Sequence, residues 1–353
     1  MKRSTVRRWI ADVGYRTGAT QALIRAGDRW RVLRGAGTFS VGPQRRDPFL
    51  VLIYHRVNRD TGLFAIERST PETFRGHMTH IARHFHAMPL EEIVRRLASD
   101  EVLPPRSIAI TFDDGYEDNY TDAYPILRQL GLPATVFLTT GVIGTGASLW
   151  FDQVLHAFEH ARRDRMTLPG EKDTTDLRQA PARAAAAFRT LQALMRLPDA
   201  TRLTTVDRIV SELDPAKAGR LPAMLDWDQV RTMASGGMSF GAHTVTHPIL
   251  TRLPLEEAER ELRASKQVIE QETDRPTTLM AYPVGRRPDY SPELTALAAR
   301  LGFQAAFTTE PGANARGDDR FLLRRVKPLG SDVPTFALGL AGHYLTEWKA
   351  GSQ

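Results

Sequence analysis

Two adjacent carboxylates followed by a glycine are the residues of this sequence best suited to chemistry. Asp113, Asp114 and Gly115 follow an apolar run at residues 107–110 whose isoleucines predict a buried strand. Glycine lets the backbone turn sharply and come close to whatever the carboxylates hold. Two neighbouring acids repel each other and lose hydration when buried, so a bound cation or a shared proton must offset that cost. The pattern therefore predicts a cation site or a proton-sharing pair.

A second polar cluster, His-Thr-Val-Thr-His-Pro at residues 243–248, supplies imidazoles. His243 and His247 are four residues apart, and we expect them on one side of a helical turn that Pro248 helps to end. Because the chain contains no cysteine, any metal ion must be held by histidine and carboxylate side chains. A histidine pair alone is more often structural, but the two clusters together favour a metal-dependent hydrolase.

The two motifs, Thr-Phe-Asp-Asp-Gly-Tyr at 111–116 and the histidine cluster, resemble in this order the first two motifs of the polysaccharide deacetylases. This is the NodB-homology group, or carbohydrate esterase family 4. Leu-Ile-Tyr-His-Arg-Val at 52–57 is similar to the opening strand of the exopolysaccharide branch, and Ala-Tyr-Pro-Val-Gly at 281–285 resembles its third motif. The resemblance covers about residues 48–330, apart from an insertion.

The resemblance implies a role for each polar residue of the two motifs. Asp114, His243 and His247 are expected to bind a divalent cation, Zn²⁺ as the first choice and Co²⁺ or Ni²⁺ as alternatives. Asp113 is expected to be the general base that takes a proton from the attacking water. The backbone N–H of Tyr116 is expected to stabilise the oxyanion. An alternative role for Asp113 is to orient a ligating histidine.

The sequence departs from the family at the general acid and at the third motif. Much of the family uses a histidine in a Leu-x-His segment after the last strands, whereas here the only histidine beyond Arg325 is His343. We expect His55, at the end of the first strand, to serve as the general acid or to adjust the pKa of Asp113. The alternative is a histidine at the barrel rim whose hydrogen bonds are satisfied and which has no catalytic role. Arg325 matches an arginine of the exopolysaccharide branch and is preferred over Arg286 as the missing positive charge.

Strand-like and helix-like segments alternate along the chain, which predicts an α/β fold with a parallel sheet. The resemblance makes this a distorted (β/α) barrel of about seven parallel strands, of the NodB type. Asp113, Asp114 and His243 then fall at carboxyl ends of strands, where such barrels carry their chemistry. We expect strands at residues 49–55, 107–112, 134–138, 238–242, 278–282, 304–307 and 321–326, and helices at 70–84, from 89, and at 226–234, 255–272 and 291–300.

The segment from about 147 to 225 is longer than the motif spacing requires. It contains an aromatic run at 149–154 and an alanine-rich stretch at 182–195. We interpret it as a helical insertion within a deacetylase domain that spans residues 48–345. It either covers the substrate groove or is a surface elaboration without a catalytic role.

The N-terminal segment, residues 1–47, is predicted to be a basic amphipathic extension. Residues 1–46 contain eleven Lys or Arg and two Asp, so the rest of this chain of net charge +6 sums to −3. An apolar stripe at helical spacing is formed by Val6, Trp9, Ile10 and Val13. Such a segment fits peripheral contact with an anionic membrane face through residues 1–46, or a helix packed on the barrel. Nucleic-acid binding is not expected, because no aromatic-and-basic platform continues into the folded domain.

The chain has no run of 18 apolar residues, and no apolar stretch precedes a small-residue cleavage site, so we expect neither a transmembrane helix nor a signal peptide. This favours a cytoplasmic location or a peripheral one at the inner membrane face. With 353 residues, 42% of them hydrophobic, the chain can bury the core of one large domain.

The expected activity is removal of N-acetyl groups from amino sugars of a polysaccharide, an oligosaccharide or a lipid-linked precursor. Two alternatives stay open: hydrolysis of O-acetyl esters or non-sugar amides at the same site, and a non-catalytic sugar-binding barrel. The intact set of Asp113, Asp114 and the two histidines argues against the second alternative, because binding alone needs no base beside a metal.

Overall fold

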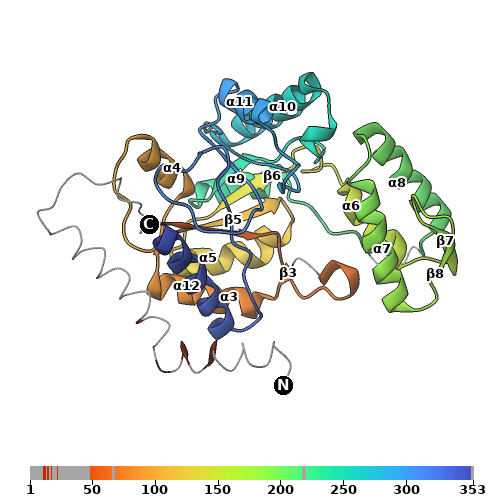
Figure 1. Cartoon of the computed structure of the whole chain (residues 1–353), viewed down its shortest axis with the longest axis horizontal. Helices are drawn as coiled ribbons and strands as arrows, with labels where there is room; N and C mark the ends of the chain where they lie inside the picture. The colour runs from red at the N-terminus through yellow and green to blue at the C-terminus, as the bar shows by residue number, and fades with distance from the viewer. Residues whose placement is uncertain are drawn as a thin grey trace, which may run out of the picture.

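The computed structural model describes residues 11–12, 14–15, 17, 22, 48–65, 68–216 and 220–350, with side chains up to residue 345. Within these residues, parallel strands form one sheet in the order β1-β5-β6-β9-β10-β11, and β4 pairs with the start of β5 (Figure 1). The strands are β1 (Leu50–Tyr54), β4 (His86–Ala87), β5 (Ser107–Asp114), β6 (Thr135–Leu138), β9 (Ser239–Ala242), β10 (Leu279–Ala281) and β11 (Ala305–Phe307). The predicted distorted barrel is confirmed.

A short extended segment joins the two edges of the sheet. Leu323 forms a parallel bridge with Phe307 of β11, and Val326 forms one with Leu52 of β1. The final predicted strand is therefore present only as these two bridges. Because Arg325 lies between them, the closure of the barrel carries this arginine to the strands of the first motif.

The side chains of β5 alternate between two cores. Ile108, Ile110 and Phe112 face the outer core beneath the helices, whereas Ala109 belongs to the inner core. By the same two-residue period, Asp113 faces the barrel interior. The inner core also contains Val51, Phe137, Leu279, Phe307 and Leu323.

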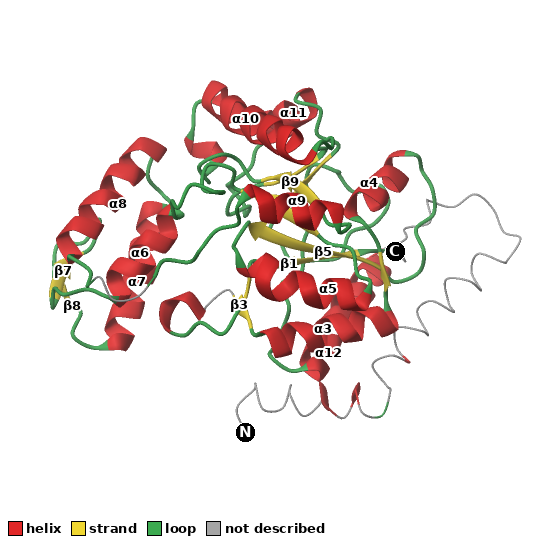
Figure 2. Ribbon diagram, turned by 180° about the vertical axis from the view of Figure 1, so that it is seen from behind, coloured by secondary structure: helices red, strands yellow, loops and turns green. Residues whose placement is uncertain are grey.

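Helices cover the outside of the sheet. Several begin as the sequence predicts, with the side chains of Thr70, Asp226 and Ser291 accepting a hydrogen bond from a backbone N–H of the first turn. In Figure 2, α3, α5 and α12 lie on one side of the strands, and α10 and α11 lie on the other. The bounds are α3 (Pro71–His84), α4 (Leu90–Ala98), α5 (Tyr124–Leu130), α9 (Trp227–Ser235), α10 (Leu255–Thr273), α11 (Pro292–Arg300) and α12 (Val333–Ala350).

The predicted insertion forms a lobe beside the barrel, drawn in green in Figure 1. We call residues 150–213 the helical lobe. It has its own hydrophobic core, built from its helices, from the hairpin between them and from Leu63 of the short helix η1 (Gly62–Ala65). The lobe consists of α6 (Trp150–Glu159), the antiparallel hairpin of β7 (Arg165–Thr167) and β8 (Thr174–Asp176), α7 (Ala180–Leu194) and α8 (Asp199–Leu213).

Most of the basic extension, including the apolar stripe predicted within residues 6–13, lies outside the described residues. Of this segment, the four described residues between 11 and 15 are helical, and the ring of Tyr15 lies 5.7 Å from that of His80 in α3. In the part of the chain that the structure describes, no helix combines the length and apolar composition needed to cross a bilayer. Membrane contact through residues 1–46 stays a prediction.

Candidate active site

Asp113, the penultimate residue of β5, is held by a two-point ion pair. Arg325 donates from Nη1 to Oδ1 at 2.6 Å and from Nη2 to Oδ2 at 2.7 Å, and both side chains are buried. The guanidinium is oriented by its Nε, which donates to the carbonyl of Thr308 at 2.9 Å, and by the ring of Phe137, 5.6 Å away. Bidentate arginine–carboxylate pairs are strong and directional. Arg325 is therefore the buried counter-ion of Asp113, whereas Arg286 is exposed.

The charges around Asp113 keep its carboxyl group ionised. Burial by itself raises the pKa of Asp113, but the guanidinium of Arg325, assisted by the nearby His243 and His55, lowers it well below its usual range. Nε2 of His243 lies 4.0 Å from Oδ2 of Asp113. His55 is half-buried and directly follows β1, whose last residue pairs with Phe112, the residue before Asp113.

Asp114 separates from Asp113 because the backbone turns at this point. The φ angles of Asp114 and Gly115 are +76° and +89°, in the left-handed region that is unfavourable for aspartate and readily adopted by glycine. A Cβ atom on Gly115 would lie 2.8 Å from Leu138 and 2.9 Å from Ile143. The positive φ angle therefore favours glycine beside the acid pair, and the turn directs Asp114 toward the loop that follows β9.

The loop at residues 243–247 is irregular, and the predicted helical turn is wrong. Thr244 and His247 have φ angles of +67° and +57°, which a right-handed helix does not permit. Glu261 of α10 accepts hydrogen bonds from two consecutive backbone N–H groups of the loop, at 2.7 and 3.0 Å. Two of the loop's carbonyls accept from the segment after β6. These long-range partners satisfy the backbone, so a helical turn is not needed.

Asp114, His243 and His247 nevertheless converge. One candidate ligand atom from each lies within 4.8 Å of the others, and all three residues are buried. Oδ1 of Asp114 lies 3.6 Å from Nε2 of His243 and 3.4 Å from Nε2 of His247. Ligands about 2.0 Å from a tetrahedral zinc ion are separated by roughly 3.3 Å, so this spacing fits a single cation.

His243 is oriented to ligate through Nε2. Nδ1 of His243 lies 2.9 Å from the carbonyl oxygen of Ala281, and donation to that oxygen leaves the Nε2 lone pair facing Asp114. Burial lowers the pKa of His243 to about 4 and lowers that of His247 well below its ordinary value. Two neutral imidazoles therefore flank a buried acid, and a divalent cation among them would offset its charge.

Tyr116 links the first motif to the helical lobe. Its hydroxyl donates to Oδ2 of Asp152 in α6 at 3.0 Å, and both side chains are buried. Burial raises the pKa of Asp152 to about 7, against the lowering effects of the Tyr116 hydrogen bond and of Arg56. The guanidinium of Arg56 lies 4.9 Å from the centre of the Tyr116 ring, and its Nε donates to Asp118 at 3.0 Å. The sequence did not indicate a role for Asp152, Arg56 or Asp118. Arg56 lies within the motif at 52–57 and Asp118 lies just after the motif at 111–116, whereas Asp152 has no such signal.

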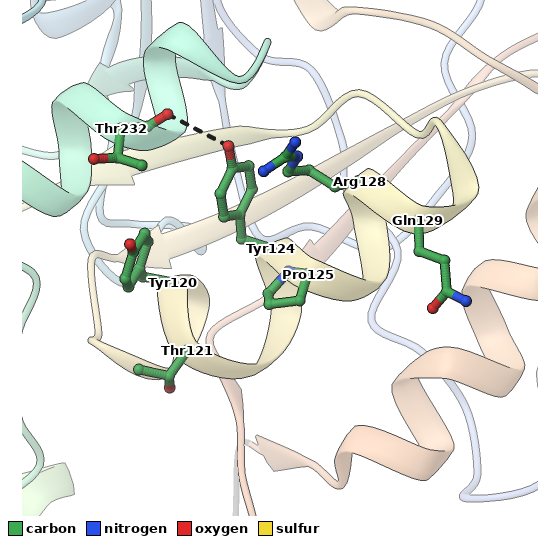
Figure 3. Close-up of a pocket in the computed structure, with 7 residues that line it drawn as sticks. All are labelled: Tyr120, Thr121, Tyr124, Pro125, Arg128, Gln129 and Thr232. Carbon is green, nitrogen blue, oxygen red and sulfur yellow. Dashed lines mark hydrogen bonds between the residues drawn. The ribbon is translucent and has the colours of Figure 1, made fainter.

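A cavity of about 570 Å³ lies away from this cluster, between α9 and the consecutive helices η2 (Asn119–Ala123) and α5 (Figure 3). The hydroxyl of Tyr124 donates to the carbonyl of Thr232 at 3.4 Å, which links α5 to α9. None of the seven lining residues belongs to the Asp114–His243–His247 cluster, so this cavity is not the candidate active site.

The fold and the cluster define a class of protein: a (β/α) barrel with an acid–imidazole site at the carboxyl ends of its strands, suited to hydrolysis. The model of the polysaccharide deacetylase family matches residues 100–306, and the chain belongs to that family and is a deacetylase enzyme. The matched range contains both motifs, whereas His55 and Arg325 lie outside it. The resemblance inferred from the sequence is confirmed.

Two curated relatives differ greatly in how much of the chain they match. The YxkH protein of Bacillus subtilis (strain 168), provisionally named a polysaccharide deacetylase, is 25% identical over 278 residues, which cover 78% of this chain and 70% of that protein. A poly-β-1,6-N-acetyl-D-glucosamine N-deacetylase of Staphylococcus aureus is 51% identical over 41 residues, only 12% of this chain and 14% of that protein.

Solved structures of other proteins share the fold. Streptococcus pyogenes PplD, solved in complex with acetate, aligns with a TM-score of 0.55 at 21% identity, over 80% of this chain and 93% of that one. IcaB from Ammonifex degensii aligns with a TM-score of 0.55 at 18% identity, over 84% of this chain and 97% of that one. At these identities the likeness establishes the barrel fold.

Removing Arg325 leaves Asp113 as a buried carboxylate without its counter-ion. We expect Arg325→Met to lower the free energy of unfolding by about 3–5 kcal/mol, measured by urea denaturation at pH 7. The double variant Asp113→Asn/Arg325→Met should recover much of that loss, because it removes both charges. The exposed control Arg286→Met should change stability by less than about 0.5 kcal/mol. A single variant as stable as the wild type, or a double variant without recovery, would contradict the ion pair.

Proposed function

We propose that this enzyme uses a divalent metal ion to remove N-acetyl groups from amino sugars of a polysaccharide or its lipid-linked precursor. The observation that supports the proposal most is the different environment of two adjacent acids. Asp113 is paired with Arg325, whereas Asp114 faces His243 and His247. One acid can therefore act as a base while its neighbour acts as a ligand.

The chain's own donor set supports a metal ion at Asp114, His243 and His247. One carboxylate and two imidazoles, without thiolate, suit Zn²⁺, with Co²⁺ or Ni²⁺ as alternatives. When bound, such an ion lowers the pKa of a coordinated water and polarises the acetyl carbonyl.

In this proposal Asp113 accepts the proton of the attacking water. Arg325 takes one lone pair of each carboxylate oxygen, so that each oxygen keeps a second lone pair for the water. The same ion pair fixes the direction in which the base points. The backbone N–H of Tyr116, next to the Asp-Asp-Gly turn, donates to the oxyanion of the tetrahedral intermediate.

His55 supplies the proton to the departing amine. Its place directly after β1 supports this role, since the last residue of β1 pairs with Phe112, next to Asp113. His343, the only histidine after Arg325, lies on α12. The alternative role of His55 is to tune the protonation of Asp113 without itself donating a proton.

The class of substrate is supported by the family and by a short local match. The 41 residues that are 51% identical belong to a relative named as acting on poly-β-1,6-N-acetyl-D-glucosamine. Amide hydrolysis is difficult without activation, which gives a physical reason for a base beside a metal site. Oligomers of N-acetylglucosamine linked β-1,6 are therefore the first substrates to assay.

Metal removal tests the proposal directly. We expect the enzyme to release acetate from β-1,6-linked N-acetylglucosamine oligomers faster than from O-acetyl xylan, to lose this activity with a chelator and to regain it with Zn²⁺ or Co²⁺. Asp113→Asn should still bind zinc but lose about 10²–10⁴-fold in kcat, because only the base is removed. Asp114→Asn should lose zinc affinity. Acetate release that persists after the metal has been stripped would contradict the metal-dependent mechanism.

A separate variant tests the acid. We expect His55→Ala to retain bound zinc and to lose about 100-fold in kcat, because the proton donor is removed. The His343→Ala variant is the matched control and should keep the wild-type rate. Turnover by His55→Ala at the wild-type rate would remove His55 from the mechanism.

A further inference from the structure

The helical lobe reaches the candidate active site through the first turn of α6. Trp150, Phe151 and Asp152 are consecutive at the start of this helix. Trp150 and Phe151 contact His247, and Asp152 contacts Tyr116. Both motif segments therefore receive contacts from one helical turn that belongs to the insertion.

Trp150 holds the backbone of a candidate metal ligand. Its indole Nε1–H donates to the carbonyl oxygen of His247 at 3.2 Å, and the ring of Phe151 packs edge-on against the His247 imidazole at 5.1 Å. His247 has a left-handed φ of +57°, an unfavourable conformation that persists only when surrounding contacts enforce it. The Trp150 hydrogen bond is such a contact, and it acts on the ligand residue itself.

The indole ring is itself fixed from within the lobe. The guanidinium of Arg202, on α8, lies 4.8 Å from the centre of the Trp150 ring, and both side chains are buried. Arg202 also forms an ion pair with Asp199. A cation packed over an indole restricts the ring to one orientation. Arg202 in the lobe thus holds the Trp150 ring, and Trp150 in turn holds the loop at 243–247.

Asp152 holds the residue that follows the Asp-Asp-Gly turn. It accepts a hydrogen bond from the Tyr116 hydroxyl. The guanidinium of Arg56 packs over the ring of the same tyrosine. The peptide group that carries the Tyr116 N–H is held at two points: the Gly115 carbonyl accepts from the Leu225 N–H at 2.9 Å, and the Tyr116 side chain is fixed by Asp152. The position of the Tyr116 side chain therefore contributes to where this N–H group points.

We propose that the helical lobe is a positioning element of the catalytic centre, in which Trp150 sets the geometry of His247 and Asp152 sets that of Tyr116. The inference rests on the proposed function and extends it to an insertion of the barrel. It is a third role beside the two open from the sequence, covering of the substrate groove and surface elaboration, and it differs from the second because a surface elaboration would leave both ends of the site untouched. Neither residue contacts the reacting atoms, so both act through the residue that they hold.

The Trp150 anchor is tested by zinc affinity, measured by competition with a chromogenic chelator. Trp150→Phe keeps an aromatic ring but loses the N–H donor, and we expect zinc to bind about 10-fold more weakly. Ile209→Val, in the core of the lobe and away from the site, is the control and should bind zinc like the wild type. Equal affinity in Trp150→Phe and the wild type would overturn this anchor. A wild-type chain that binds no zinc would overturn the proposed function itself.

The Asp152 anchor is tested by separating kcat from KM on the same oligosaccharide. We expect Asp152→Ala to lower kcat about 10-fold with KM unchanged, because the substrate still binds while the transition state loses a well-placed donor. Asp152→Asn keeps an oxygen that accepts from Tyr116 and should restore kcat to within about twofold of the wild type. An unchanged kcat in Asp152→Ala, or an asparagine variant as slow as the alanine variant, would overturn the role of Asp152.

Discussion

Two adjacent acids at the end of a buried strand impose the constraint on which this structure depends. Asp113 and Asp114 are both buried, so each carboxylate needs its own compensation. The protein supplies Arg325 to the first and directs the second between two neutral imidazoles, an arrangement that a divalent cation would complete. The left-handed turn at the second acid keeps the two environments apart. Residues that are neighbours in sequence thereby acquire different chemistry, one suited to a base and the other to a ligand.

The parts of this arrangement that depend on local pattern could be predicted from the sequence. The apolar run at 107–110 predicts β5, and its two-residue alternation explains why Asp113 faces the interior. The convergence of Asp114, His243 and His247 also follows from residue types and motif order. The backbone of the loop at 243–247 could not be predicted in the same way. Its four-residue spacing suits a helical turn, but hydrogen bonds to Glu261, which lies on another helix, determine its conformation.

Contacts between distant parts of the chain account for what the sequence did not reveal. Arg325 pairs with an acid 212 positions away, and only the family resemblance singled it out. Trp150 lies 97 positions from His247, and Asp152 lies 36 positions from Tyr116. No periodicity or motif within the run at 149–154 indicates which of its side chains reach the site. The insertion could be recognised from its length, whereas its contacts required the folded structure.

Anomalous diffraction at the zinc edge, from crystals of the wild-type enzyme grown with Zn²⁺, tests the division of roles between the two acids most directly. We predict one peak at about 2.0–2.2 Å from a carboxylate oxygen of Asp114 and from Nε2 of both His243 and His247. In the electron-density map from the same crystals, Asp113 should keep its two hydrogen bonds to Arg325. A zinc ion ligated by Asp113, or one bound away from the two histidines, would contradict the account.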